Sequence, residues 1–455
     1  MLDLIASRFK KLSPAVDFWS LRIVEGQSQA LSVRQDILEP VENSGSLGAM
    51  LTIIDKGGAG YAATSDLTIA GLKQAVAQAR KFAAMSVNRG VFSVDNLVRP
   101  GVSGRYQTLS GSSWSSISMQ DKIQLLTEAC AALKISDAIV YWLAYLRYSS
   151  SKTLLTTCDG IRIEQSFDYI RPGLIAVANK GSRSQTRTGG GAGSARQGGL
   201  EQLQPLGFPA QASRISEEAL ALLAAPECPS GRMQILLTPD QMMLQIHESI
   251  GHPLELDRIL GDERNYAGTS FVTQEMFGSY QYGSELLNIT FDPTVGNEIA
   301  SYAFDDDGTE AKREFIIDKG ILKTPLGGAT SQARAHCRGV ANARADSWKR
   351  PAIDRMANLN LEPGDASFAE LVQSVENGVL MKTNASWSID DSRNKFQFGC
   401  EYGQRIEDGE LKGLLRNPNY RGISANFWRN LAKVGNQSTF DVLGTPNCGK
   451  GEPNQ

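Results

Sequence analysis

The first hundred residues alternate between short apolar runs and polar stretches, and the runs have the spacing of strands followed by a helix. Residues 18–25, 30–33 and 50–55 are predicted strands, and residues 57–60 (Gly-Gly-Ala-Gly) predict a loop. Residues 68–85 place apolar side chains at helical spacing, and we expect Ser65 or Asp66 to cap the helix. This pattern predicts a helix packed on a sheet.

A second segment repeats these elements in a different order. Residues 118–133 predict a helix capped by Ser118, residues 139–149, 154–157 and 161–170 predict strands, and residues 210–225 predict a further helix. Between them, residues 181–199 are rich in glycine, serine and arginine but lack a complete phosphate-binding motif. We expect a flexible loop there. The alternative is a flap over a substrate, with Arg183, Arg187 and Arg196 meeting a peptide carboxylate.

The pattern changes after Pro226, which favours a domain boundary there. Residues 233–238 predict a strand that leads into a helix, and short strands with tight turns at Asp318-Lys319-Gly320 and Asp408-Gly409 follow. We predict an α+β fold in which residues 1–226 form an N-terminal region of helices on a sheet, with two subdomains at about 1–100 and 101–226. Residues 227–455 form a mostly antiparallel β domain that carries the metal-binding helix described below.

The amino-acid composition is that of an ordinary globular protein. The 455 residues are 41% hydrophobic and 21% charged, as in ordinary globular domains. With a net charge of −3, the chain lacks the excess of basic residues that is typical of nucleic-acid-binding proteins. The six cysteines form no CxxC pair, and no apolar stretch reaches the length of a membrane span. These features predict a cytoplasmic protein that binds neither nucleic acid nor membrane.

Two of the three histidines, His247 and His252, lie in one short segment, with Glu248 directly after the first. Imidazole nitrogens suit zinc, and a carboxylate beside the metal can accept a proton from water. On a regular helix, residues five apart point about 140° away from each other, so the two rings would diverge. We therefore expect a π-bulge or a helix end, which Gly251 and Pro253 favour.

A tetrahedral zinc site needs at least one more protein ligand. From chemistry alone the candidates are Glu255, Asp257, His336 and a cysteine thiolate. We favour Cys448, because glycines near it allow the backbone to approach the metal and Lys450 would favour the thiolate. Glu255 and Asp257 are alternatively groups that orient an imidazole.

The segments His247-Glu248-x-x-x-His252, Asp305-Asp306-Asp307-Gly308-Thr309 and Cys448-Gly449-Lys450 together resemble the TldD/PmbA family of zinc metallopeptidases, long called modulators of DNA gyrase. The resemblance is to the TldD type, which carries the metal motif. It implies zinc on His247, His252 and Cys448, Glu248 as the catalytic carboxylate, and a homodimer or a heterodimer with a PmbA/TldE-type subunit. Family members continue beyond the Cys-Gly-Lys segment, so we expect this chain, ending at Gln455, to lack a closing strand.

The predicted activity is zinc-dependent hydrolysis of unfolded peptides or peptide precursors, with Glu248 as general base. The substrate is expected to lie along an edge strand of the C-terminal sheet. The alternative is a non-catalytic peptide-binding or regulatory subunit with a structural zinc, which predicts a fourth protein ligand such as His336 or Glu255.

Overall fold

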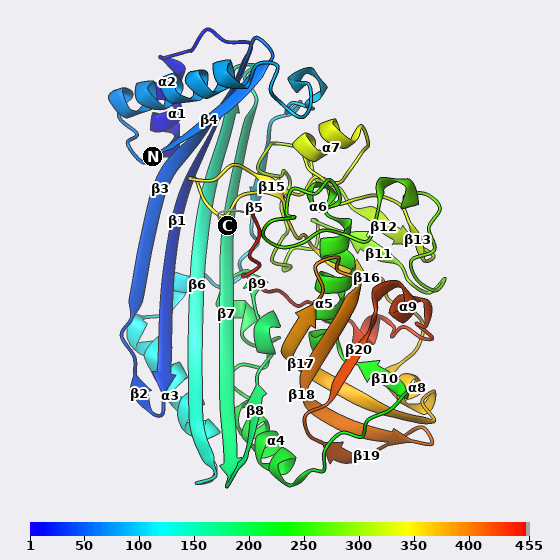
Figure 1. Ribbon diagram of the computed structural model, residues 1–455. Coiled ribbons are helices and arrows are strands. Elements are labelled where there is room, and N and C mark those ends of the chain that lie inside the picture. The colour runs from blue at the N-terminus through cyan, green and yellow to red at the C-terminus, as the bar shows by residue number, and fades with distance from the viewer. Residues whose placement is uncertain (452–455) are drawn as a thin grey trace.

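The computed structural model describes residues 1–451, and its N-terminal half is built on one long twisted sheet (Figure 1). The strands run in the order β4-β3-β1-β6-β7-β5, with β2 beside β1 and both β8 and β9 beside β7. Their bounds are β1 Phe18–Arg34, β2 Ile37–Leu38, β3 Glu42–Asp55, β4 Gly58–Thr64, β5 Gly104–Gln107, β6 Ile139–Thr157, β7 Arg162–Lys180, β8 Arg183–Thr188 and β9 Arg196–Gln197.

The central strands are longer than their apolar runs predict. Strand β1 continues through polar residues 26–29, because these residues pair with β3 on one side and with β6 on the other. Backbone pairing on both sides keeps a strand extended whatever its side chains are. The loop predicted at residues 57–60 is wrong except at Gly57, because residues 58–60 pair with β3. Gly58 and Gly60 belong to β4, where a Cβ would lie 2.0 Å and 2.3 Å from carbonyl oxygens of the overlying helix.

Four helices cover one face of this sheet: α1 Leu2–Lys10, α2 Ile69–Ser86, α3 Met119–Leu133 and α4 Ala212–Ala224. Leu21 and Ile23 of β1 pack in the same core as α1 and α2, whereas Leu31 and Val33 pack in the core formed with α3 and α4. All four are odd-numbered, so they lie on the same face of the strand. The N-cap of α2 is Thr68, not Ser65 or Asp66, and Ser118 caps α3 as predicted.

The C-terminal half contains smaller sheets, and the α+β fold class is confirmed. One sheet has the order β10-β17-β18-β19, with β20 beside β18, and another has the order β13-β12-β11-β16. Within residues 1–451, neighbouring strands of these two sheets are antiparallel, except β10 with β17. The bounds are β10 Gln234–Leu237, β11 Ile289–Phe291, β12 Glu314–Asp318, β13 Ile321–Leu322, β14 Ala343–Arg344, β15 Ile353–Asp354, β16 Leu359–Leu361, β17 Asn377–Ile389, β18 Lys395–Glu407, β19 Glu410–Leu415 and β20 Asn419–Ile423. The helices are α5 Pro239–Ile246, α6 Leu256–Ile259, α7 Ala329–Ala335, α8 Phe368–Gln373 and α9 Ser424–Arg429.

The glycine-rich segment 181–199 is ordered, contrary to the flexible loop predicted for it. It forms β8 and β9 beside β7. The Arg187 guanidinium is buried between Glu218 at 2.9 Å and Glu401 at 2.8 Å, and Arg196 is also buried. The alternative of an arginine-bearing flap is therefore wrong for Arg187 and Arg196, whose side chains are buried in packed structure, whereas Arg183 is exposed.

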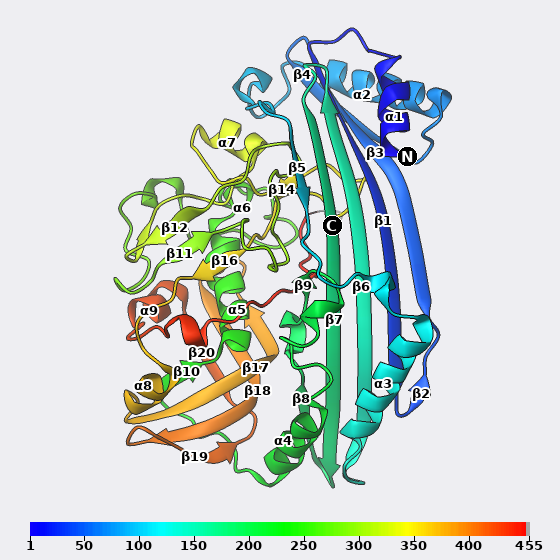
Figure 2. The same ribbon diagram turned by 180° about the vertical axis from the view of Figure 1, so that it is seen from behind.

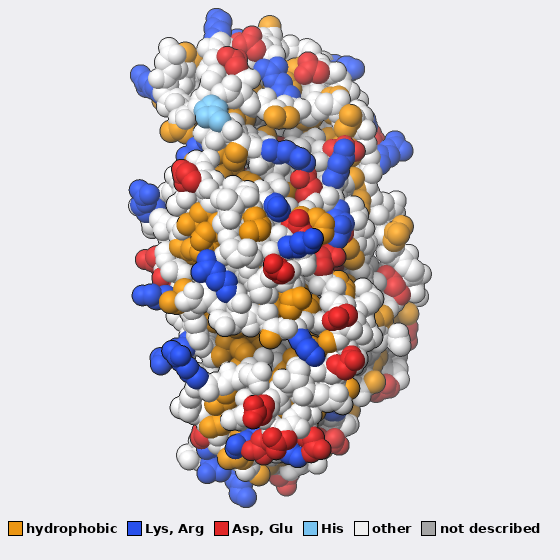
Figure 3. Space-filling view, turned by 90° about the vertical axis from the view of Figure 1, so that its right-hand side faces the viewer, with side chains coloured by type: hydrophobic (Ala, Val, Ile, Leu, Met, Phe, Trp, Pro, Cys, Tyr) orange, Lys and Arg blue, Asp and Glu red, His pale blue; other side chains and the backbone are white. Residues whose placement is uncertain are grey.

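The two halves face each other across a cavity of about 3040 Å³. Residues of the uncovered face of the long sheet line one wall of it, and residues of the C-terminal half line the other. Figures 1 and 2 show the long sheet and the C-terminal sheets facing each other. The end of the chain runs back between them, and Gly444 forms a bridge with Ser194. Figure 3 shows acidic and basic side chains interspersed over the outer face of the C-terminal half. Within residues 1–451, we find no helix with the length and apolar content that a membrane span requires.

Candidate metal centre

His247 begins a π-helical turn, His247–Gly251, that continues α5, and His252 begins the 3₁₀ turn that follows it, His252–Leu254. The backbone N–H of His252 donates to the carbonyl of His247, five residues earlier. This wider turn brings both rings to one side of the helix, with centroids 4.6 Å apart and planes at 88°. The distortion expected from the five-residue spacing is confirmed.

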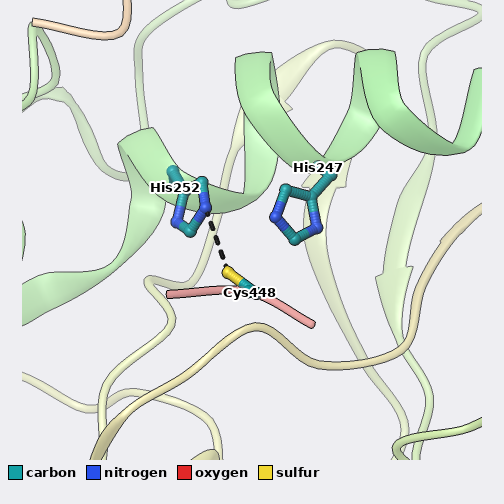
Figure 4. Close-up of side chains that lie close together, drawn as sticks. All are labelled: His247, His252 and Cys448. Carbon is teal, nitrogen blue, oxygen red and sulfur yellow. Dashed lines mark hydrogen bonds between the residues drawn. The ribbon is translucent and has the colours of Figure 1, made fainter. Parts of the chain in front are cut away.

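Cys448 meets this turn from the end of the chain (Figure 4). Its Sγ atom lies 3.5 Å from Nε2 of His252, and one ligand atom from each of His247, His252 and Cys448 falls within 4.8 Å of the others. His336, the other histidine considered as a metal ligand, is exposed at the end of α7 and does not belong to this cluster.

The donor set fits a zinc ion. Zinc bonds of about 2.0–2.3 Å in a tetrahedron separate the donor atoms by about 3.3–3.7 Å, so the sulfur and Nε2 of His252 already have the required spacing. Burial lowers the pKa of both His247 and His252 to about 4, which keeps both rings neutral and leaves a nitrogen lone pair for a metal.

The thiol is protonated without a metal. Burial, followed by the charge of Glu255, raises the pKa of Cys448 to about 11. Lys450 lowers this pKa, but it is a minor influence because its Nζ donates to Asp257 at 2.7 Å and to the carbonyl of Asp354 at 2.6 Å. Lys450 therefore acts in the expected direction, but burial and Glu255 outweigh it. Its main contacts hold the end of the chain against α6.

Glu255 lies behind the second histidine. Its Oε2 is 2.9 Å from Nδ1 of His252, which directs Nε2 toward the sulfur. Burial raises the pKa of Glu255, but Lys450 and His252 outweigh it and hold that pKa well below its usual value. Asp257 contacts Lys450, so of the two carboxylates only Glu255 is placed to orient an imidazole.

Glu248 is 5% exposed, and its Oε2 accepts a hydrogen bond of 2.7 Å from Nη1 of Arg393. Sequence reasoning missed this arginine, which lies 145 residues away in the turn between β17 and β18. The cavity reaches His247 and Cys448, so this side of the cluster is open to a substrate.

Comparison with known proteins gives the same family for every large segment. Residues 19–83, 112–223 and 230–451 match the first, central and C-terminal domains of the PmbA/TldA metallopeptidases. A metalloprotease of Methanocaldococcus jannaschii is 25% identical over 455 residues, covering 99% of this chain and 95% of its own. A zinc metalloprotease TldD homolog of Saccharolobus solfataricus is 31% identical over 198 residues, covering 43% of this chain and 42% of its own.

Two solved structures share the fold. A Thermotoga maritima protein, proposed to be a modulator of a DNA gyrase, has a TM-score of 0.77 at 17% identity and covers 96% of this chain and 95% of its own. TldE from Thermococcus kodakarensis has a TM-score of 0.71 at 15% identity, with 96% and 94% covered. The three matched domains span most of the sequence, and the chain therefore belongs to the PmbA/TldD family of metallopeptidases.

Proposed function

We propose that this chain is a zinc-dependent peptidase that hydrolyses unfolded peptides or processes peptide precursors. The observation that carries the proposal is the cluster of His247, His252 and Cys448, with ligand atoms within 4.8 Å of one another and Glu248 next in sequence to the first. The zinc metalloprotease name of the Saccharolobus solfataricus relative supports the choice of metal.

Zinc bound there supplies a Lewis acid that acidifies water and polarises a carbonyl group. Glu248 is the proposed general base: it accepts a proton from the attacking water and passes it to the leaving amine. Glu255 holds His252 by its Nδ1 atom, so the ring keeps Nε2 toward the metal position.

The cavity favours an extended peptide as substrate. Its volume of about 3040 Å³ exceeds the roughly 300–1,000 Å³ of small-molecule sites. Within residues 1–451, strand β16 pairs only with β11. Its residues line the cavity near the π-turn, where Leu359 approaches Gly251. An extended peptide can add to such an edge through main-chain hydrogen bonds, with little demand on its side chains.

The assembly is proposed to be a homodimer or a heterodimer with a PmbA/TldE-type subunit. A structural relative named TldE has the same fold over nearly its full length. Size measurement of the purified chain, alone and mixed with such a subunit, distinguishes the two assemblies.

Zinc content and cleavage of an unstructured fluorogenic peptide test the function. We expect Glu248→Gln to retain zinc and to lose about 10²-fold or more in kcat, because general acid–base catalysis contributes about 10²–10⁴-fold. Cys448→Ser should lose zinc, and the exposed Glu285→Gln is the control. N-methylation of peptide amides should raise KM more than side-chain changes do. Equal cleavage by wild type and Glu248→Gln would rule out Glu248 as the base, and a zinc protein without cleavage would favour a structural metal.

A further inference from the structure

A buried ion pair joins Glu248 to a residue that neither the motif nor the family comparison identifies. The side chains of Arg393 and Glu248 are 14% and 7% exposed, and Nη1 lies 2.7 Å from Oε2. The arginine comes from the turn between β17 and β18, whereas Glu248 lies on the π-turn after α5. Two elements far apart in sequence thus converge on this carboxylate.

The turn that carries Arg393 is held on its own side by Asp390. The Oδ1 atom of Asp390 accepts the backbone N–H groups of Asn394 at 2.7 Å and Lys395 at 2.9 Å. Arg393 has a left-handed backbone with φ 61°, and its carbonyl accepts a bond from Ser424 Oγ at 3.0 Å. This local network fixes the backbone from which the guanidinium projects.

Residues 267–271 hold the same turn from the other side. Thr269 and Phe271 donate their N–H groups to the carbonyls of Asp391 at 2.6 Å and Ser392 at 2.8 Å. The approach is so close that a Cβ at Gly268 would lie 2.2 Å from the carbonyl oxygen of Asp391. The turn is therefore clamped between two segments.

The carbonyl oxygen of Ala267 accepts hydrogen bonds from both arginines that contact Glu248 and Glu255. Ala267 accepts from Nη2 of Arg393 at 3.2 Å and also from Nη1 of Arg258. Arg258 in turn donates to Glu255, which holds His252. Each carboxylate next to the histidines is thus oriented by an arginine, and both arginines share one backbone acceptor.

The pairing leaves one oxygen of Glu248 available. Arg393 binds Oε2, and within residues 1–451 no hydrogen bond is formed to Oε1. A general base acts efficiently when it is held in one orientation with an oxygen free to take the proton. Stability explains the pair less well, because a buried ion pair contributes little more than well-packed apolar residues.

We propose that Arg393 is a positioning residue that fixes the Glu248 carboxylate, with Oε2 held and Oε1 directed to the attacking water. This proposal rests on the proposed function, in which Glu248 is the base. Arg393 does not bind zinc, and it contacts the water only through Glu248.

The test compares wild type with Arg393→Met, Arg393→Lys, Glu248→Gln and the double variant Arg393→Met/Glu248→Gln. We expect Arg393→Met to lower kcat about 10²-fold, as for a misplaced catalytic group, with KM and zinc content unchanged. Arg393→Lys should recover part of kcat. The double variant should be no slower than Glu248→Gln, because the arginine acts through the carboxylate. Arg405→Met, on the same hairpin but paired with Glu407, is the control.

Thermal unfolding of the metal-free proteins gives a second readout that does not depend on activity. Arg393→Met leaves a buried carboxylate unpaired, so its midpoint should fall and should rise again in the double variant. The proposal is wrong if Arg393→Met keeps the wild-type kcat, or if its lost activity is matched by lost zinc. If wild type cleaves no peptide, the proposed function fails and Arg393 has no catalytic role. The unfolding midpoints of the metal-free variants then still show whether Arg393 holds the Glu248 carboxylate.

Discussion

Of the three proposed ligands, Cys448 is the one whose protonation would couple most directly to metal binding. Its thiol has a pKa raised to about 11, by burial first and by Glu255 next, whereas the pKa values of His247 and His252 are lowered to about 4. Between these values the histidines are neutral and the thiol holds its proton. A metal that takes the thiolate must therefore displace one proton.

We predict that zinc binding near pH 7.5 releases about one proton, so that the apparent affinity rises about tenfold for each pH unit in this range. Calorimetry in buffers with different ionisation enthalpies measures the number of protons released on zinc binding. Cys448→Ser should bind weakly and release none. Release of no proton by the wild type would contradict the assignment of Cys448 as a ligand.

At the scale of elements, the end of the chain depends on buried charge contacts. Lys450 is fully buried, bonded to Asp257 and to the carbonyl of Asp354, and 3.3 Å from Glu255. Gly451 also donates to Glu263 at 3.1 Å. These contacts place Cys448, two residues before Lys450, beside the π-turn.

We predict that Lys450→Met weakens zinc binding and destabilises the fold by about 3–5 kcal/mol, because it leaves buried carboxylates without their cation. Competition with a chelator and thermal unfolding measure the two effects. Lys412→Met, which removes an exposed lysine paired with Glu410, serves as the control. Wild-type zinc affinity in Lys450→Met would show that Cys448 is placed by other contacts.

Local patterns predicted many elements correctly. The helix capped by Ser118 and the hairpin turns at residues 318–320 and 408–409 are confirmed. The prediction was wrong where polar or glycine-rich segments form strands by pairing with their neighbours, as in the polar centre of β1 and in β8. Such segments become strands because neighbouring strands satisfy their backbone groups.

At the scale of the whole molecule, the cavity between the halves contains a carboxyl group that affects stability. Glu298 lines the cavity and is 5% exposed, its Oε1 has no hydrogen-bond partner within residues 1–451, and burial raises its pKa to about 8. The folded state therefore holds this proton more tightly than the unfolded chain does. Its contribution to stability is complete below about pH 4.5 and is lost as pH rises through 8.

We predict that Glu298→Gln raises the unfolding midpoint relative to wild type at pH 9 and leaves it nearly unchanged at pH 5, because glutamine cannot ionise. Unfolding curves across this pH range test the difference, with the exposed Glu285→Gln as the control. An equal shift at both pH values would mean that Glu298 affects packing and not protonation.

The sequence by itself determined the fold class, the helices α2, α3 and α4, two hairpin turns, and the pairing of His247 and His252 around a distorted helical turn, because each depends on residues close together in the chain. Chemistry alone favoured Cys448 without excluding the other candidate ligands, and the resemblance then selected it. Tertiary structure decided what meets across long separations. Cys448 lies 196 residues from His252, and Arg393 lies 145 from Glu248. These contacts follow from how sheets pair and pack in space, which no local spacing of residues encodes.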